Sequence, residues 1–320
     1  MAAAHQTAPE QISVKLTGFA DSEQANRFGH AIAETVRLIS TVIDLERLDG
    51  ITVSFDYDAA LASLDRGFNE TAPLKKTSTD LLLGVAMSAP VLREGVVKAH
   101  MIYYAPVVTA LDGGDEESQR RALSLLAHEC GHVEAIKHSD MAFPDRMFRP
   151  VHGKIHFLNE IAESIWSEYS ACRISAIFGK ELTSIYEDSF VSVLRVARDR
   201  TNAAIREYRL HADLSRVLQE AGQHICQPLK IGAYLFGHLD GLKLEFDVVP
   251  TTEAALRETQ YDRCMNEMHE ALRELWSRLG RWSDVAEFDV LENIAREALA
   301  ERGMIFTAID DERWHLDIPP

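Results

Sequence analysis

Residues 121 to 138 read RALSLLAHECGHVEAIKH, and this stretch decides the interpretation of the whole chain. His128 and His132 are four residues apart, so on a helix both imidazoles project from one face. Two imidazoles at this spacing can bind one zinc ion. Glu129 stands beside the first of them and can act as general base on a water molecule that the metal acidifies. The stretch therefore predicts a helix that carries a zinc site and a catalytic glutamate.

The residues around the motif favour a helix from Glu116 to about Lys137. Asp115 ends a turn just before it and is a suitable N-cap, and acidic residues in the first turn suit the positive end of the helix dipole. Apolar residues recur at helical spacing and predict a buried face formed by Leu123, Leu126, Cys130 and Val133. Because this face flanks the motif, a surface helix with two solvated histidines is the less favoured interpretation.

A tetrahedral catalytic zinc needs a third protein ligand and keeps one position open. His138 lies six residues after His132, which matches the spacing of the metzincin pattern HExxHxxGxxH. In that pattern a glycine lets the helix break and brings the third histidine to the metal. Ala135 stands at this position here, and alanine tolerates positive φ poorly. A polar histidine near the end of the helix is therefore the favoured interpretation of His138.

A carboxylate on the next long helix, expected from about His156 to Phe178, is the other candidate for the third ligand, as in gluzincins. Helical spacing places Glu168 within an apolar stripe and Glu163 on the polar side. An unpaired carboxylate on an inward stripe is costly, and a metal would compensate its charge. Glu168 is the favoured ligand and Glu163 the second choice. The alternative role for Glu168 is a buried ion pair, with Arg173 or Arg121 as partner.

The remaining pattern predicts an α+β chain in which a small mixed sheet precedes a helical second half. Periodicity predicts a helix over residues 22–48, and strand patterns occur at 51–55, 81–87 and 98–108. Beyond residue 180, helices are expected at 181–220, 229–240, 254–279 and 284–302. The expected organisation is a loose tail over 1–14, a metal-binding domain over 15–180 and a helical region over 181–320.

The composition excludes several classes of protein. The net charge of −17, from 50 acidic and 33 basic residues, disfavours direct binding to nucleic acid, because an acidic chain repels phosphates. The four cysteines form no CxxC pair and are expected to be buried reduced thiols. The first ten residues, MAAAHQTAPE, lack the pattern of a signal peptide, and the longest apolar run, 81–92, is too short to span a bilayer. We therefore expect a cytoplasmic protein with no membrane partner.

The stretch Arg121 to His138 resembles the active-site helix of ImmA/IrrE-type zinc metallopeptidases. Members of that family have an arginine, then apolar residues, then a HExxH helix, often with a further non-ligand histidine. Downstream the family has a Glu-x-x-Ala signature, which Glu168-Tyr169-Ser170-Ala171 matches. The resemblance covers roughly residues 50–178, and Cys172 departs from it, since the family commonly has Asn there. It implies that Glu168 completes the zinc site and that the strand before the motif helix, 98–108, lines the substrate cleft.

Together these features predict a zincin-like domain that hydrolyses peptide bonds of a protein or peptide substrate. Zinc would be held by His128, His132 and Glu168, Glu129 would activate water, and an edge strand would pair with the extended substrate. One alternative is a catalytically silent zincin-like regulatory protein that recognises a partner through its helical second half. The presence of Glu129 argues against it, since a structural zinc needs no general base. Another alternative is a zinc hydrolase with a non-peptide substrate.

Overall fold

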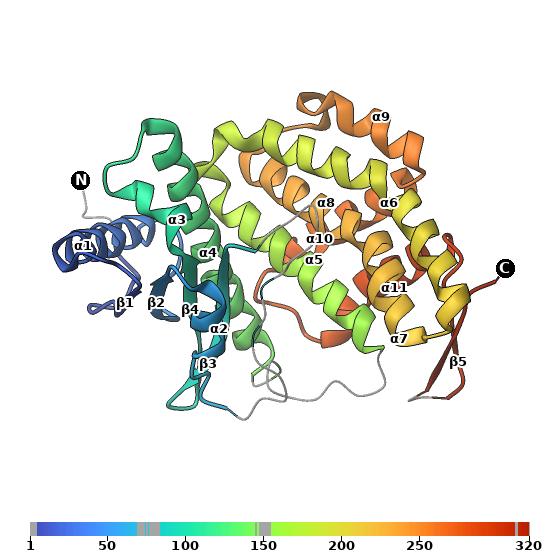
Figure 1. Ribbon diagram of the computed structural model, residues 1–320, viewed down its shortest axis with the longest axis horizontal. Coiled ribbons are helices and arrows are strands. Elements are labelled where there is room, and N and C mark those ends of the chain that lie inside the picture. The colour runs from blue at the N-terminus through green and yellow to red at the C-terminus, as the bar shows by residue number, and fades with distance from the viewer. Residues whose placement is uncertain are drawn as a thin grey trace. The chain divides into compact units, whose positions relative to one another are not determined.

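The computed structural model describes residues 5–68, 74, 76, 84–144, 146, 155–310 and 313–319. The chain is α+β, as predicted, and divides into two compact units (Figure 1). Unit 1 comprises Met1–Met147 with Ser170–Lys180, and unit 2 comprises Phe148–Tyr169 with Glu181–Pro320. The division falls inside one continuous helix, α5 (His156–Ser175), which contributes residues to both units.

Unit 1 contains a four-stranded mixed sheet. Its strands lie in the order β1 (Val14–Thr17), β2 (Leu48–Ser54), β4 (Val96–Tyr104) and β3 (Ala86–Arg93). The first three are parallel, and β3 runs antiparallel to β4 at the edge of the sheet. The strand that was expected to line a substrate cleft, β4, is therefore a central strand, and β3 occupies the edge.

Helices cover both faces of this sheet. On one face, α1 (Ser22–Ile39) and α4 (Glu116–Ala142) pack their apolar residues against β2 and β4, and the core of the unit lies between them. On the other face, the short helix α2 (Tyr57–Ala62) packs against Ile102 of β4. The motif helix is thus anchored on the sheet along its length, as its apolar spacing predicted.

Several predicted boundaries in unit 1 are wrong for local reasons. The strand expected over 98–108 ends at Tyr104, because Pro106 has no backbone N–H to donate, and the chain turns into α3 (Ala105–Val108). The strand expected at 81–87 begins only at Ala86; residues 81–83 lie outside the described residues. The helix expected over 22–48 ends at Ile39. The tail expected over 1–14 is in part ordered: the Thr7 hydroxyl donates hydrogen bonds to the backbone oxygens of Ser40 and Ile43, and β1 begins at Val14.

Unit 2 is mostly helical. Its helices are part of α5, then α6 (Thr183–His211), α7 (Leu214–Val217), α8 (Gln223–Leu242), α9 (Pro250–Thr259), α10 (Asp262–Ser277) and α11 (Asp289–Ala300). A π-helical turn, Leu218–Gly222, joins α7 to α8. A two-stranded hairpin of β5 (Ile305–Ala308) and β6 (Trp314–Asp317) follows and was not predicted. The helix expected over 254–279 is two helices, because Gln260 adopts a left-handed conformation between them.

All four cysteines are free and buried, as predicted. Among the helices that the structure describes, none has the length and apolar character needed to cross a bilayer.

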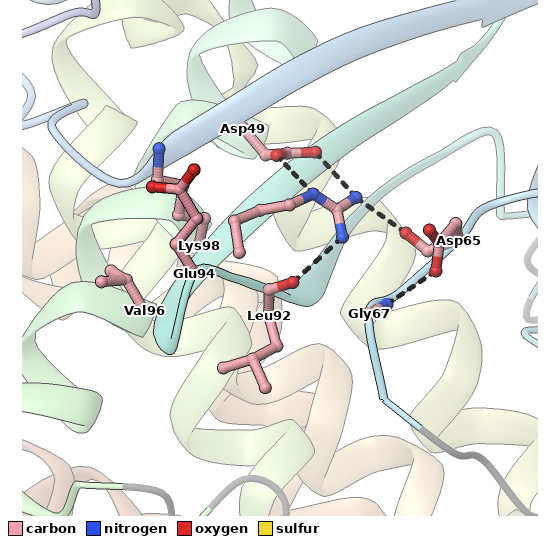
Figure 2. A pocket seen from close by; sticks show the side chains of 8 residues that line it. Asp49, Asp65, Gly67, Leu92, Glu94, Val96 and Lys98 are labelled. Atoms are coloured by element: carbon pink, nitrogen blue, oxygen red, sulfur yellow. Dashed lines mark hydrogen bonds and ion pairs between the residues drawn. The ribbon is translucent and has the colours of Figure 1, made fainter.

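A polar cluster beside the β3–β4 turn connects three strands of the sheet, and Figure 2 shows its Asp49 with the hydrogen bonds from Arg93. Arg93 donates two hydrogen bonds to the carboxylate of Asp49, at 2.9 and 3.2 Å. His100 Nδ1 lies 2.8 Å from the same carboxylate, and His100 Nε2 lies 2.9 Å from Thr52 Oγ1. Burial raises the pKa of Asp49, but the hydrogen bonds from His100 and Arg93 outweigh this effect, so the pKa lies below its usual value. The folded chain therefore favours the ionised carboxylate.

We expect Asp49→Asn to lower the free energy of unfolding at pH 7 by about 1.5–3 kcal/mol, the usual size for hydrogen bonds to a charged group. A carboxyl whose folded-state pKa is depressed stabilises the fold above its unfolded pKa of about 4. The difference from wild type should therefore persist from pH 7 to about pH 5 and shrink as the pH falls below about 4. Urea unfolding followed by circular dichroism at each pH measures it.

Glu23→Gln is the control for this experiment, because its side chain is 84% exposed. Its effect should stay within about 0.5 kcal/mol at every pH. An Asp49→Asn difference that remained constant down to pH 3 would contradict the role assigned to ionisation.

Candidate metal centre

The motif helix α4 begins where the sequence predicted. The side chain of Asp115 accepts hydrogen bonds from the backbone N–H groups of Glu117 and Ser118, at 3.0 and 2.9 Å, and so caps the helix. The helix then continues to Ala142, about one turn beyond the predicted end at Lys137. The capped start fixes the phase of the helix, and hence the direction in which each residue of the motif points.

Gly131 of α4 lies against the backbone of α5. A Cβ atom on Gly131 would lie 2.6 Å from the backbone oxygen of Ala171, a distance that real Cβ atoms do not show. The absence of a side chain at this position therefore lets the backbones of the two helices come into contact. This contact, within unit 1, determines which residues of α5 face the motif.

His128 and His132 point toward each other. Their Nε2 atoms are 3.1 Å apart, and their rings are nearly perpendicular, at 87°. Two nitrogens bound to one zinc ion at about 2.0–2.1 Å with a tetrahedral angle would lie about 3.3 Å apart. The arrangement therefore fits two imidazoles that share one cation through their Nε2 atoms.

Glu168 reaches this pair because α5 is one continuous helix. The Sγ atom of Cys172 lies 3.6 Å from His128 Nδ1, so α5 faces the motif at that residue. Glu168 precedes Cys172 by four residues and therefore lies on the same side of α5, one turn away. The ligand atoms of the three predicted residues, His128, His132 and Glu168, all lie within 4.8 Å of one another. Two imidazoles and one carboxylate form a donor set that catalytic zinc sites use.

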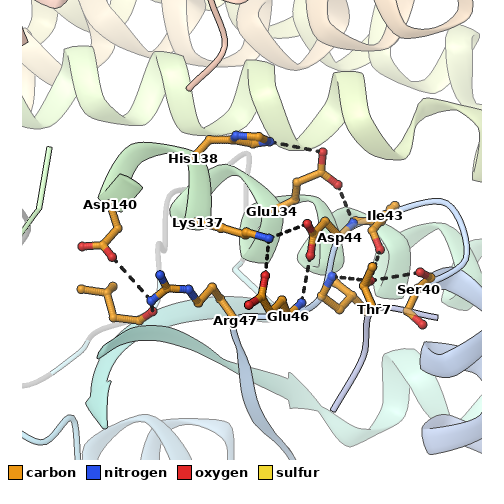
Figure 3. Close-up of polar contacts among 12 residues, drawn as sticks. Thr7, Ser40, Ile43, Asp44, Glu46, Arg47, Glu134, Lys137, His138 and Asp140 are labelled. Atoms are coloured by element: carbon orange, nitrogen blue, oxygen red, sulfur yellow. Dashed lines mark hydrogen bonds and ion pairs between the residues drawn. The ribbon is translucent and has the colours of Figure 1, made fainter. Parts of the chain in front are cut away.

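The other proposed third ligands lie elsewhere. His138 Nε2 is 3.7 Å from Glu134 Oε1, and Glu134 also accepts a hydrogen bond from the backbone N–H of Asp44 (Figure 3). His138 thus belongs to a polar cluster that connects α4 to the segment after α1. Glu163 is exposed and lies about 140° around α5 from Glu168. Among the described residues, neither belongs to the group that could hold a metal.

The structure also identifies a cation beside Glu168. Lys230 Nζ on α8 lies 3.4 Å from Glu168 Oε1, and the two side chains are only 24% and 13% exposed. The sequence interpretation had named Arg121 or Arg173 as the partner of a buried ion pair. Arg121 instead pairs with Glu117 on the exposed side of α4. Glu168 therefore has a cation beside it in this structure, and a metal ion bound by Glu168 would compete with Lys230 for the carboxylate.

Glu129 lies on the side of α4 that faces the sheet and is 4% exposed. Ser88 on β3 lies 2.8 Å from Glu129 Oε2 and donates a hydrogen bond to it. Burial raises the pKa of Tyr57, and the carboxylate of Glu129 raises it further. The hydroxyl of Tyr57 is buried and has no hydrogen-bond partner among the residues that the structure describes. The carboxylate thus accepts a hydrogen bond from Ser88 and lies close enough to the Tyr57 hydroxyl to influence it.

Sequence reasoning missed Ser88 and Tyr57. The signal for Ser88 was its position as a polar interruption in the apolar run 81–92. A polar side chain within a strand that packs on a core indicates a specific partner, because a buried hydroxyl needs a hydrogen bond. No local signal distinguished Tyr57 from an ordinary core tyrosine.

Comparisons of the chain with protein-family models, with curated proteins and with solved structures found no match.

We expect the purified chain to contain about one zinc ion, and His132→Ala and Glu168→Ala each to lose it, because a site with two protein ligands holds zinc weakly. His138→Ala is the matched control, since it removes an imidazole from the same helix without touching the cluster. Elemental analysis after dialysis measures the metal content. Zinc that remained in both ligand variants, or that failed to bind the wild-type chain when supplied, would contradict the assignment.

Proposed function

We propose that this chain is a zinc-dependent metallopeptidase in which His128, His132 and Glu168 hold the metal and Glu129 is the general base. The observation that carries the proposal is the convergence of three ligand atoms within 4.8 Å around a motif that also contains Glu129. A purely structural zinc site needs its ligands but has no use for a carboxylate beside them.

The residues of the chain divide the reaction between them. A bound zinc ion would supply Lewis acidity, which polarises a carbonyl and makes water easier to deprotonate. Glu129 accepts the proton of the attacking water and later donates it to the leaving amine. Ser88 donates a hydrogen bond to one oxygen of this carboxylate and so orients the proposed base. The low exposure of Glu129 strengthens these interactions, because water screens them little.

The edge strand β3 is the natural place for an extended peptide to bind. It carries Ser88, so its edge lies beside the proposed general base. The backbone of Arg66 already accepts a hydrogen bond from Leu92, and its guanidinium donates to Pro90, so this end of β3 is covered. A substrate that adds a strand by backbone hydrogen bonds would therefore pair with the end nearer Ser88.

A second candidate function is a catalytically silent zincin-like regulatory protein. The ion pair between Lys230 and Glu168 favours it, because this pair already supplies a positive charge to the carboxylate. The buried and hydrogen-bonded Glu129 favours the enzyme, since burial of an unused carboxylate is costly. A hydrolase with a non-peptide substrate would bind zinc equally well and would fail to cleave a peptide library.

We expect Glu129→Gln to retain zinc and to lose peptide cleavage by about 10²–10⁴-fold, the usual size of a general-base contribution. Cleavage of a peptide library, read by mass spectrometry, supplies the activity, and elemental analysis supplies the metal content. Glu134→Gln is the matched control on the same helix, because its partners are Asp44 and His138. Equal cleavage by wild type and Glu129→Gln would exclude the proposed mechanism.

We expect Ser88→Ala to lower kcat by about tenfold with little change in KM, because the variant loses the hydrogen bond that positions Glu129. Ser88→Thr keeps the hydroxyl and should recover part of the activity. Steady-state kinetics on one cleaved peptide measures both. A kcat that was unchanged in Ser88→Ala would show that this hydrogen bond does not position the base.

A further inference from the structure

One side of helix α8 carries a polar stripe on an otherwise buried helix. Most residues of α8 are buried, including Ile225, Leu229, Ala233 and Phe236. The partly exposed residues recur every three or four positions, at His224, Gln227, Lys230 and Tyr234. A helix in the middle of a helical unit would normally be apolar on all sides. The stripe therefore indicates a side that meets polar groups or solvent.

Lys230 connects this stripe to the proposed metal centre. Its ammonium lies 3.4 Å from Glu168 Oε1, and both residues belong to unit 2. Only 24% of the Lys230 side chain is exposed, so its charge is partly removed from water. A partly buried charge that loses its partner is destabilising, and it attracts another group of opposite sign.

A metal ion bound at Glu168 would free Lys230 to take another partner. The carboxylate of Glu168 would then share its negative charge with a dication, and its attraction for the ammonium would weaken. Lys230 is a flexible point charge with three donors and can turn toward a new anion without a change of backbone. In this structure the ammonium of Lys230 pairs with a carboxylate, so a carboxylate is the kind of anion that we expect it to bind next.

We propose that Lys230 binds a carboxylate of the substrate, so that the preferred peptides carry a free C-terminus or an acidic side chain close to the scissile bond. This inference rests on the proposed peptidase function. The net charge of −17 makes a local cation necessary for such a preference, because a strongly acidic chain otherwise repels anionic peptides. Lys230 supplies that cation beside a proposed metal ligand.

The test compares wild type with Lys230→Met and Lys230→Arg, all loaded with zinc. Lys243→Met is the control, since Lys243 is exposed and follows the end of α8. The substrate is one peptide that the wild type cleaves, made with a free or an amidated C-terminus and with Glu or Gln next to the scissile bond. These versions separate the two sources of the carboxylate.

In wild type and Lys243→Met, removal of the relevant carboxylate should raise KM about tenfold with little change in kcat. Lys230→Met should cleave all versions with the same KM, and Lys230→Arg should keep most of the wild-type difference in KM. As a measurement independent of turnover, zinc affinity from competition with a chelator should rise several-fold in Lys230→Met, because the competing cation is gone. Lys230→Arg should leave the zinc affinity close to that of wild type.

Two results would overturn the inference while the peptidase assignment stands. Wild type could cleave all versions with equal KM, or Lys230→Met could lower kcat equally on every version with KM unchanged. The latter would assign Lys230 to the developing oxyanion instead of a substrate carboxylate. A wild-type chain that bound no zinc or cleaved no peptide would overturn the proposed function, and this inference with it.

Discussion

The close approach of α4 and α5 at Gly131 is the constraint on which the candidate centre depends. Helices with ordinary side chains between them stay 8–10 Å apart, and a glycine permits a shorter separation. The backbone of Ala171 fills the space that a side chain at residue 131 would need. This contact sets the rotation of α5, which turns Cys172 toward His128 and places Glu168 one turn away. A single absent Cβ thus determines which carboxylate can meet the two imidazoles.

The sheet positions Ser88 beside Glu129, the proposed general base. Because β3 lies at the edge and runs antiparallel to β4, its residue Ser88 contacts the face of α4 that carries Glu129. The same strand would present its outer backbone groups to a peptide. The group that orients the proposed base and the surface that would bind the substrate therefore belong to one element. In the proposed peptidase, this arrangement would tie the position of the scissile bond to the position of the carboxylate.

Local patterns in the sequence predicted the motif helix, its N-cap and the preference for Glu168 over Glu163, because each depends on helical phase within a short segment. Features set by distant residues were not predictable in this way. The early end of α1 follows from Ser40 and Thr41, whose hydroxyls bond to backbone carbonyls of the last turn and compete with the helix. The strand β1 is a different case, because its apolar and polar residues alternate over residues 12–17 and this local strand signal was overlooked. The lysine beside Glu168 comes from a helix more than sixty positions along the chain, and no spacing rule connects them.

The placement of His132 and Glu168 on separate helices has a thermodynamic consequence. A cation held by both would join two points of the chain that are far apart in sequence, as a disulfide does, and would restrict the unfolded ensemble. Because a preformed site does not exist in the unfolded chain, the free energy of binding would add to that of folding. The supply of metal would then affect the stability of the folded chain as well as its activity.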